Sequence, residues 1–286
     1  METGKKFFIT DFDGTLLTDD KTISGEDITT LENLRQKKIL TAIATGRSVY
    51  SFEKALTDIG IKKESLPIDY LIFSTGAGIM DLPGGRVIYQ KALPVSDIGE
   101  ITDYLDHGKV DYMVHKSIPD THYFLYKSHG TDNPDFYARL SIYKAYALPL
   151  EPGYYHTQTA TEVLAIVPGG IGRDVLKKIK KDLSRFSVIH ATSPLDKTSS
   201  WIEIFHKCVS KSNSVAWLVK RLGLNRKNVL SVGNDYNDQD LLAWSGNGFV
   251  VDNAPAPLKQ VFKTVSSNNL NGVSDAAKKA GWLNRD

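Results

Sequence analysis

Two carboxylates near the N-terminus are the residues whose spacing most clearly points to chemistry. Asp11 and Asp13 stand two positions apart in the segment Asp-Phe-Asp-Gly-Thr-Leu-Leu, which directly follows a short, mostly apolar stretch. The glycine after Asp13 lets the chain bend, so that both carboxylates can face one site. Because two close carboxylates repel each other, one of them must take up a proton or a cation must neutralise the pair. The motif therefore predicts a bound Mg²⁺, a pair of nucleophile and acid, or both.

The elements around this motif must bring polar residues from distant parts of the chain to one place. Strands are expected at residues 6–10, 39–44, 70–74, 229–232 and 249–251, and helices at residues 26–38, 48–59 and 238–244. This alternation of short apolar segments with amphipathic ones predicts an α/β fold, in which helices cover a Rossmann-like parallel sheet. Ligands of such sheets collect at the carboxyl ends of the strands, where Asp11 stands.

The middle of the chain differs in kind. Residues 79–88 have the pattern of a hairpin whose turn is supplied by Pro83, Gly84 and Gly85. The segment 111–155 that follows is rich in tyrosine. We therefore predict a core domain of residues 1–80 and 190–286, and an inserted α+β domain of residues 81–189. A chain of 286 residues is long enough for two such domains.

Composition and charge exclude several classes of protein. The 35 Lys and Arg residues nearly balance the 33 Asp and Glu residues, which disfavours a nucleic-acid or membrane-surface partner. The single cysteine, Cys208, excludes an intramolecular disulfide and a thiolate-rich metal site. Neither a signal-peptide core nor an apolar stretch of the ~20 residues that cross a bilayer is evident, so we expect a cytoplasmic protein. Its oligomeric state is not indicated.

The Asp11 segment resembles the first motif of the haloacid dehalogenase (HAD) superfamily of phosphohydrolases. Three later segments follow in the order of that superfamily: Ala44-Thr45-Gly46-Arg47, Val209-Ser210-Lys211 and Gly233-Asn234-Asp235-Tyr236-Asn237-Asp238. The middle module lies between the second and third of these motifs, as in the Cof-like subgroup, which has a large α/β cap of type C2. The resemblance implies a HAD-like core with an inserted cap, and a site between the two.

The resemblance also implies an activity, that of a Mg²⁺-dependent phosphatase acting on a small phosphorylated metabolite, with sugar phosphates as the expected class. Asp11 would attack phosphorus and form an aspartyl-phosphate. Asp13 would protonate the leaving oxygen and then take a proton from the attacking water. The residues implied to bind the phosphoryl group are Thr45, Gly46, Arg47 and Lys211. Arg47 could equally pair with a carboxylate on the helix that it begins.

The fourth motif departs from the pattern of the family, which is commonly Gly-Asp-x-x-Asn-Asp. Asn234 stands where the first Asp is expected, and Asp235 follows it. The implied Mg²⁺ ligands are Asp11, the backbone carbonyl of Asp13, and residues among Asn234, Asp235 and Asp238. Three alternatives stay open: Asn234 ligates through its amide oxygen, Asp235 replaces it, or Asp238 carries the metal. An amide ligand would weaken Mg²⁺ binding, because it brings no negative charge.

Two other functions compete with hydrolysis. A phosphosugar mutase of related architecture would move the phosphoryl group within one sugar and release no inorganic phosphate. A non-catalytic phospho-metabolite-binding protein would bind its ligand without Mg²⁺-dependent phosphate release. Asp11, Asp13, Thr45 and Lys211 argue against the second alternative, because a site relieved of catalysis need not keep all four.

Overall fold

The computed structural model describes residues 4–130, 132–151, 153 and 156–284. The chain forms two compact units. The first, the core unit, comprises Met1–Arg47, Ser51–Tyr89 and Ser210–Asp286, and the second, the cap unit, comprises Ser48–Tyr50 and Gln90–Val209. The main boundaries thus fall later in the chain than the expected limits of 80/81 and 189/190.

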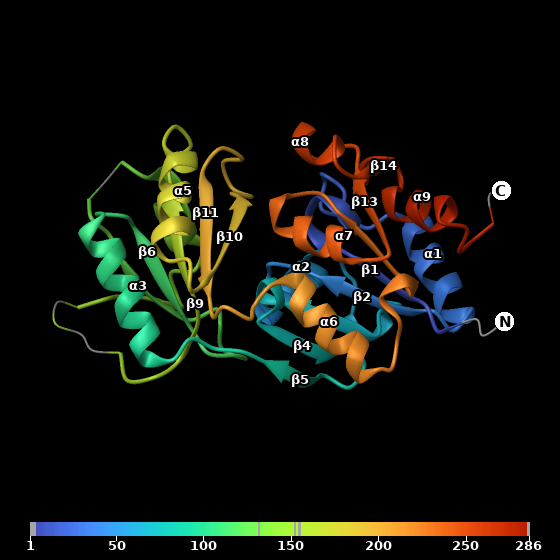
Figure 1. Ribbon diagram of the computed structural model, residues 1–286, viewed down its shortest axis with the longest axis horizontal. Coiled ribbons are helices and arrows are strands. Elements are labelled where there is room, and N and C mark those ends of the chain that lie inside the picture. Colours follow the sequence, from blue (N-terminus) through green and yellow to red (C-terminus); the bar gives the residue numbers. More distant parts are fainter. Residues whose placement is uncertain (1–3, 131, 152, 154–155, 285–286) are drawn as a thin grey trace. The chain divides into compact units, whose positions relative to one another are not determined.

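The core unit is built on an eight-stranded sheet (Figure 1). Its order is β14 (Lys263–Val265), β13 (Asn247–Val251), β12 (Val229–Gly233), β1 (Phe7–Thr10), β2 (Leu40–Ala44), β3 (Tyr70–Phe73), β4 (Gly78–Asp81) and β5 (Arg86–Gln90). The six strands from β14 to β3 are parallel, and β4 runs antiparallel to β3. The predicted α/β class with a parallel core sheet is confirmed.

The hairpin expected at residues 79–88 is present as β4 and β5, but it extends the core sheet and does not belong to the inserted unit. Its first strand continues the backbone ladder of β3, with Ile79 opposite Ile72. Both isoleucines are buried in the same apolar cluster as Phe7 and Ile9 of β1. Burial of this apolar surface holds the hairpin on the core sheet.

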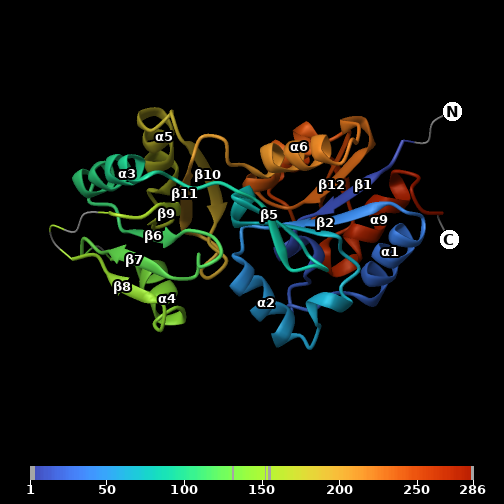
Figure 2. The ribbon, with the colours of Figure 1, turned by 90° about the horizontal axis from the view of Figure 1, so that it is seen from below.

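Helices cover both faces of the core sheet. They are α1 (Gly25–Gln36), α2 (Val49–Asp58), α6 (Lys211–Arg221), α7 (Gln239–Trp244), α8 (Ala256–Lys259) and α9 (Gly272–Lys279). Figure 2 shows α6 on one face and α1 with α9 on the other. Val215, Leu218 and Val219 of α6 lie at helical spacing and are buried against the sheet. This packing fixes the N-terminus of α6, and with it the position of Lys211.

The cap unit contains a six-stranded sheet. Its order is β10 (Ser187–Thr192), β11 (Ser200–Phe205), β9 (Ala160–Val167), β6 (Tyr112–Lys116), β7 (Phe124–Lys127) and β8 (Ala147–Pro149). Figure 2 shows α3 (Val95–His107) and α5 (Gly172–Asp182) on one face and α4 (Pro134–Ile142) on the other. All pairings are antiparallel except that of β7 with β8. This α+β composition agrees with the sequence pattern.

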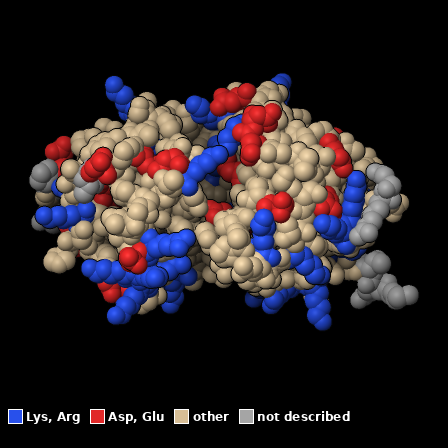
Figure 3. Space-filling model, turned by 90° about the horizontal axis from the view of Figure 1, so that it is seen from above, with Lys and Arg blue, Asp and Glu red and all other residues tan. Residues whose placement is uncertain are grey.

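Basic and acidic side chains both occur across the face shown in Figure 3, as a net charge of +2 suggests. Within the part of the chain that the structure describes, no helix is both long enough and apolar enough to span a membrane.

Candidate active site

The first motif occupies a tight turn at the carboxyl end of β1. The amide of Asp11 donates to the carbonyl of Val232 in the neighbouring strand, at 2.8 Å. The chain then turns through Phe12–Leu16, where Gly14 has a φ of +69°. A Cβ at this position would lie 2.5 Å from Nδ2 of Asn234. The backbone conformation therefore favours glycine, and a larger residue would also require the Asn234 side chain to move.

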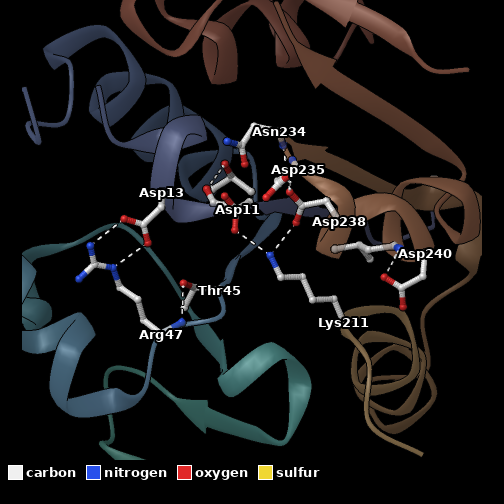
Figure 4. A network of polar contacts seen from close by, with 11 residues as sticks. Asp11, Asp13, Thr45, Arg47, Lys211, Asn234, Asp235, Asp238 and Asp240 are labelled. Carbon is white, nitrogen blue, oxygen red and sulfur yellow. Dashed lines mark hydrogen bonds and ion pairs between the residues drawn. The ribbon is translucent and has the colours of Figure 1, made fainter. Parts of the chain in front are cut away.

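A buried ion-pair triad joins the first, third and fourth motifs (Figure 4). Nζ of Lys211 lies 2.7 Å from Oδ1 of Asp11 and 2.6 Å from Oδ1 of Asp238. The Lys211 side chain is fully buried, and both carboxylates are nearly so. The three residues are more than 20 positions apart in the sequence, and the order of the parallel strands brings them together. The structure thus joins three of the residues that the sequence singled out.

The triad carries one positive and two negative charges away from water, which shifts its protonation equilibria. Burial, followed by the negative charge of Asp238, raises the pKa of Asp11 to about 7, although Lys211 acts in the opposite direction. Burial alone would lower the pKa of Lys211, but the two carboxylates outweigh it and hold the pKa above its ordinary value. Lys211 therefore stays charged, and Asp11 is the group whose protonation changes near neutral pH.

The N-terminus of α6 positions Lys211. The hydroxyl of Ser210 accepts a hydrogen bond from the amide of Asn213, at 3.2 Å, and so caps the helix. The carboxylate of Asp240 accepts from both the amide and the hydroxyl of Ser212, at 3.0 and 2.6 Å. Sequence reasoning missed Asp240, because no local pattern links it to a helix that begins 29 residues earlier.

Asp13 faces Arg47. Nε and Nη2 of Arg47 donate to the two oxygens of the Asp13 carboxylate, each at 2.7 Å, in a bidentate pair. Nη1 of Arg47 also donates to the carbonyl of Ser51, and the guanidinium lies 5.6 Å from the centroid of the Phe12 ring. Arg47 thus pairs with a carboxylate, but this carboxylate belongs to the first motif and not, as the sequence suggested, to the helix that follows Arg47. Figure 4 shows Asp13 directed away from Lys211 and toward Arg47.

The second motif forms the loop after β2. The amide of Thr45 donates to the carbonyl of Ile72, and its hydroxyl accepts from the amide of Arg47 at 3.0 Å. Gly46 lies between them and is half-buried. The Thr45 hydroxyl is thereby held on the same side of the loop as Asp11, as Figure 4 shows.

The segment after β3 supports this loop and was not predicted to do so. The amide of Ser74 donates to the carbonyl of Arg47, and the amide of Thr75 donates to the carbonyl of Thr45. Thr75 has a φ of +53°, a conformation that costs a β-branched residue about 1–3 kcal/mol. A Cβ at Gly76 would lie 2.4 Å from the carbonyl oxygen of Ser210. This strained segment therefore lies against both the second and the third motif.

The fourth motif follows β12 and turns back on Asp238. Oδ2 of Asp238 accepts from the amides of Asn234 and Asp235, at 2.9 and 3.1 Å, while its Oδ1 accepts from Lys211. One carboxylate thus holds both the turn and the lysine. Figure 4 shows the side chains of Asn234 and Asp235 beside Asp11.

The donor atoms here suit a hard cation. Asp11, Asn234 and Asp235 offer side-chain oxygens, and Asp13 offers a backbone carbonyl. Within residues 4–130, 132–151, 153 and 156–284, no three side chains of His, Cys, Asp or Glu are arranged as a metal-binding group. Mg²⁺ does not need such a group, because it binds through one or two carboxylates and keeps several waters. The residues present therefore fit Mg²⁺.

Comparison with known proteins identifies the family. A sequence model of the haloacid dehalogenase-like hydrolases matches residues 8–276. The chain belongs to this family. Its relatives include the 5-amino-6-(5-phospho-D-ribitylamino)uracil phosphatase YitU of Bacillus subtilis, which is 23% identical over 291 residues and covers 96% of this chain and 97% of its own.

Two solved structures have the same fold as this HAD-like hydrolase. BT1666 from Bacteroides thetaiotaomicron, a HAD phosphatase, is 18% identical with a TM-score of 0.78, covering 99% of this chain and 97% of that one. The HAD subclass IIB sugar phosphatase BT4131 is 17% identical with a TM-score of 0.76, covering 98% of this chain and all of its own. The predicted membership of the HAD phosphatases, in the Cof-like subgroup, is confirmed.

We expect Lys211→Met to lower the free energy of unfolding of the metal-free protein by about 3–5 kcal/mol, because two buried carboxylates lose their cation. The difference in the free energy of unfolding between the wild type and this variant should grow as the pH rises from about 5 to about 8. Because folding raises the pKa of Asp11, its carboxyl binds more protons in the folded state, and stability falls with rising pH. The variant lacks the positive charge of Lys211, which opposes this rise of the pKa, so its stability should fall further. Urea denaturation in EDTA at several pH values measures both effects.

Lys220→Met is the matched control, because Lys220 lies on the same helix with an exposed side chain. It should change the free energy of unfolding by less than about 0.5 kcal/mol at every pH. Equal effects of the two substitutions would contradict the central role of the buried lysine.

Proposed function

We propose that this HAD-family phosphatase hydrolyses phosphate monoesters of small metabolites through an aspartyl-phosphate on Asp11, with Mg²⁺ as its cofactor. The observation that carries the proposal is the Asp11–Lys211–Asp238 triad at the carboxyl ends of β1 and β12. A carboxylate held by a fixed buried cation is oriented for attack, and the same cation stabilises negative charge that develops on the phosphoryl oxygens.

Each neighbouring residue has a role in this scheme. Lys211 binds and orients the phosphoryl group beside Asp11, and the hydroxyl of Thr45 donates to one of its oxygens, with Gly46 leaving room for the ester. Asp13 transfers a proton to the leaving oxygen and later takes one from water. In the structure its carboxylate is held by Arg47. It must therefore leave that pair, or Arg47 must turn to a substrate oxygen, before the proton moves.

The cofactor site would be formed by Asp11, the backbone carbonyl of Asp13, and one or both of Asn234 and Asp235. When bound, Mg²⁺ would neutralise the converging anions and favour the ionised form of the nucleophile. Asp238 would act mainly through Lys211, because its oxygens already accept from that lysine and from two backbone amides.

The proposed substrate class is a phosphorylated sugar or a similarly polar metabolite. Two comparisons support it: YitU acts on a phosphoribityl compound, and BT4131 is a sugar phosphatase. No feature of the described residues favours phosphoryl transfer within one sugar over hydrolysis, and release of inorganic phosphate separates the two.

The Asp11→Asn variant tests the nucleophile. We expect kcat for phosphate release from p-nitrophenyl phosphate to fall by at least about 10⁴-fold, because the amide cannot form the acyl phosphate. The fold should persist, since Lys211 keeps Asp238 as a partner. A malachite-green assay and circular dichroism measure the two effects.

Asp58→Asn makes the same chemical change at an exposed position of α2 and should leave kcat unchanged. Turnover retained in Asp11→Asn would remove Asp11 from the nucleophile role. A wild type that consumes a sugar phosphate without releasing phosphate would favour the mutase.

The Asn234→Asp variant tests the departure in the fourth motif. We expect about tenfold tighter Mg²⁺ binding by isothermal titration calorimetry, which corresponds to ~1.4 kcal/mol, because a charged ligand replaces an amide. Asn213→Asp adds the same charge at an exposed position of α6 and should leave the affinity unchanged. Unchanged affinity in Asn234→Asp, together with lost binding in Asp235→Asn, would assign the ligand to Asp235 instead.

A further inference from the structure

The outer strands of the core sheet place two asparagines next to the first motif. Asn253 follows β13 by two positions, and Asn268 follows β14 by three. Because β14, β13, β12 and β1 are parallel neighbours, their carboxyl ends meet at one edge of the sheet. Both asparagines therefore reach the turn that carries Asp11 and Asp13, although about 240 residues separate them in the sequence.

The two side chains donate to backbone carbonyls of the turn. Nδ2 of Asn253 donates to the carbonyl of Gly14 at 2.8 Å, directly after Asp13. Nδ2 of Asn268 donates to the carbonyl of Leu17, the last residue of the motif, at 3.0 Å. The middle and the end of the turn are thus each held by an amide donor from a distant loop.

The two asparagines are also joined to each other. The backbone amide of Asn268 donates to Oδ1 of Asn253 at 3.0 Å, which fixes the orientation of the Asn253 amide toward Gly14. Nδ2 of Asn268 lies 3.1 Å from Oδ1 of Asp19, and Nδ2 of Asn269 lies 2.9 Å from Oδ2 of the same carboxylate. We call the two residues Asn253 and Asn268, with these bonds, the asparagine bridge.

Burial of the polar side chain of Asn268 lowers the stability of the fold. Asn268 is fully buried, and its Oδ1 has no hydrogen-bond partner among the described residues. A buried acceptor without a hydrogen-bond partner destabilises the folded state. An apolar side chain at this position would avoid the loss of stability. We therefore attribute the presence of Asn268 to the amide group that it donates to the Leu17 carbonyl.

We infer that Asn253 and Asn268 are positioning residues for phosphoryl transfer. They hold the Gly14 and Leu17 carbonyls, and hence the turn between them and Asp11, so that the nucleophile and Asp13 keep their places relative to Lys211. A nucleophile misplaced by about 1 Å can lose about 10²-fold in rate, which is the effect that the bridge prevents. The inference rests on the proposed roles of Asp11 and Asp13.

The variants Asn253→Asp and Asn268→Asp keep the shape of each side chain and remove its amide donor. Each should lower kcat for p-nitrophenyl phosphate by about 10–100-fold, with KM changed by less than about threefold, because the turn is displaced while the phosphate-binding residues remain. Activity is measured at a temperature at which circular dichroism shows every variant folded.

A transition-state analogue separates positioning from stability. Orthovanadate takes up the five-coordinate geometry of the reacting phosphorus, whereas inorganic phosphate resembles the ground state. In both variants the inhibition constant for orthovanadate should rise by the same factor by which kcat/KM falls. The constant for phosphate should stay within about twofold of the wild-type value.

Asn271→Asp is the matched control. It also replaces an amide by a carboxylate, and it removes the bond from Asn271 to Oε2 of Glu26, which joins α9 to α1 and does not touch the turn. It should lower the melting temperature and leave kcat unchanged.

Wild-type kcat in both bridge variants, or equal losses of orthovanadate and phosphate binding, would overturn the inference. So would a loss of kcat in Asn271→Asp as large as theirs. These outcomes are distinct from failure of the proposed function, which is tested by the activity of Asp11→Asn.

Discussion

A single buried ammonium group between two carboxylates is the interaction on which the site depends. Lys211 contacts Asp11 and Asp238 at hydrogen-bond distance with its side chain removed from water. Removing one member of such a group leaves an uncompensated charge in a medium of low polarity, so the three residues must be present together. Three segments of the chain are thereby required to meet at the carboxyl ends of β1 and β12.

The surrounding structure provides the rigidity that this arrangement needs. Asp240 and Ser210 hold the N-terminus of α6, and the strained segment at Thr75 lies against the loop after β2. The asparagine bridge holds the turn after β1 from the loops that follow β13 and β14. Phosphate monoesters are among the slowest bonds to hydrolyse, and enzymes that cleave them depend on fixed charges and donors more than on any one group. A site assembled from rigid strand ends meets that demand.

The protonation of the site follows from the same geometry. Burial and Asp238 raise the pKa of Asp11 to about 7, so this proposed nucleophile would be partly protonated at neutral pH without further positive charge. A cation at Asp11 would restore the ionised form, which gives the proposed Mg²⁺ a role beyond binding the substrate. Arg47 contributes at the other carboxylate, where its bidentate pair directs Asp13 toward the loop after β2 and away from Lys211.

The sequence by itself determined the α/β class, most strands and helices of the core, and the residue types of the four motifs that form the candidate site. These are local properties, because apolar periodicity and a polar residue after a strand can be read within about ten positions. It also showed that Asn234 departs from the family pattern. The tertiary structure alone decided that Arg47 pairs with Asp13, that Asp238 holds Lys211, that β4 and β5 extend the core sheet, and that Asn253 and Asn268 hold the turn. The side-chain contacts among these depend on strand order, which brings together residues between about 30 and 250 positions apart, and no pattern in a short segment encodes that order.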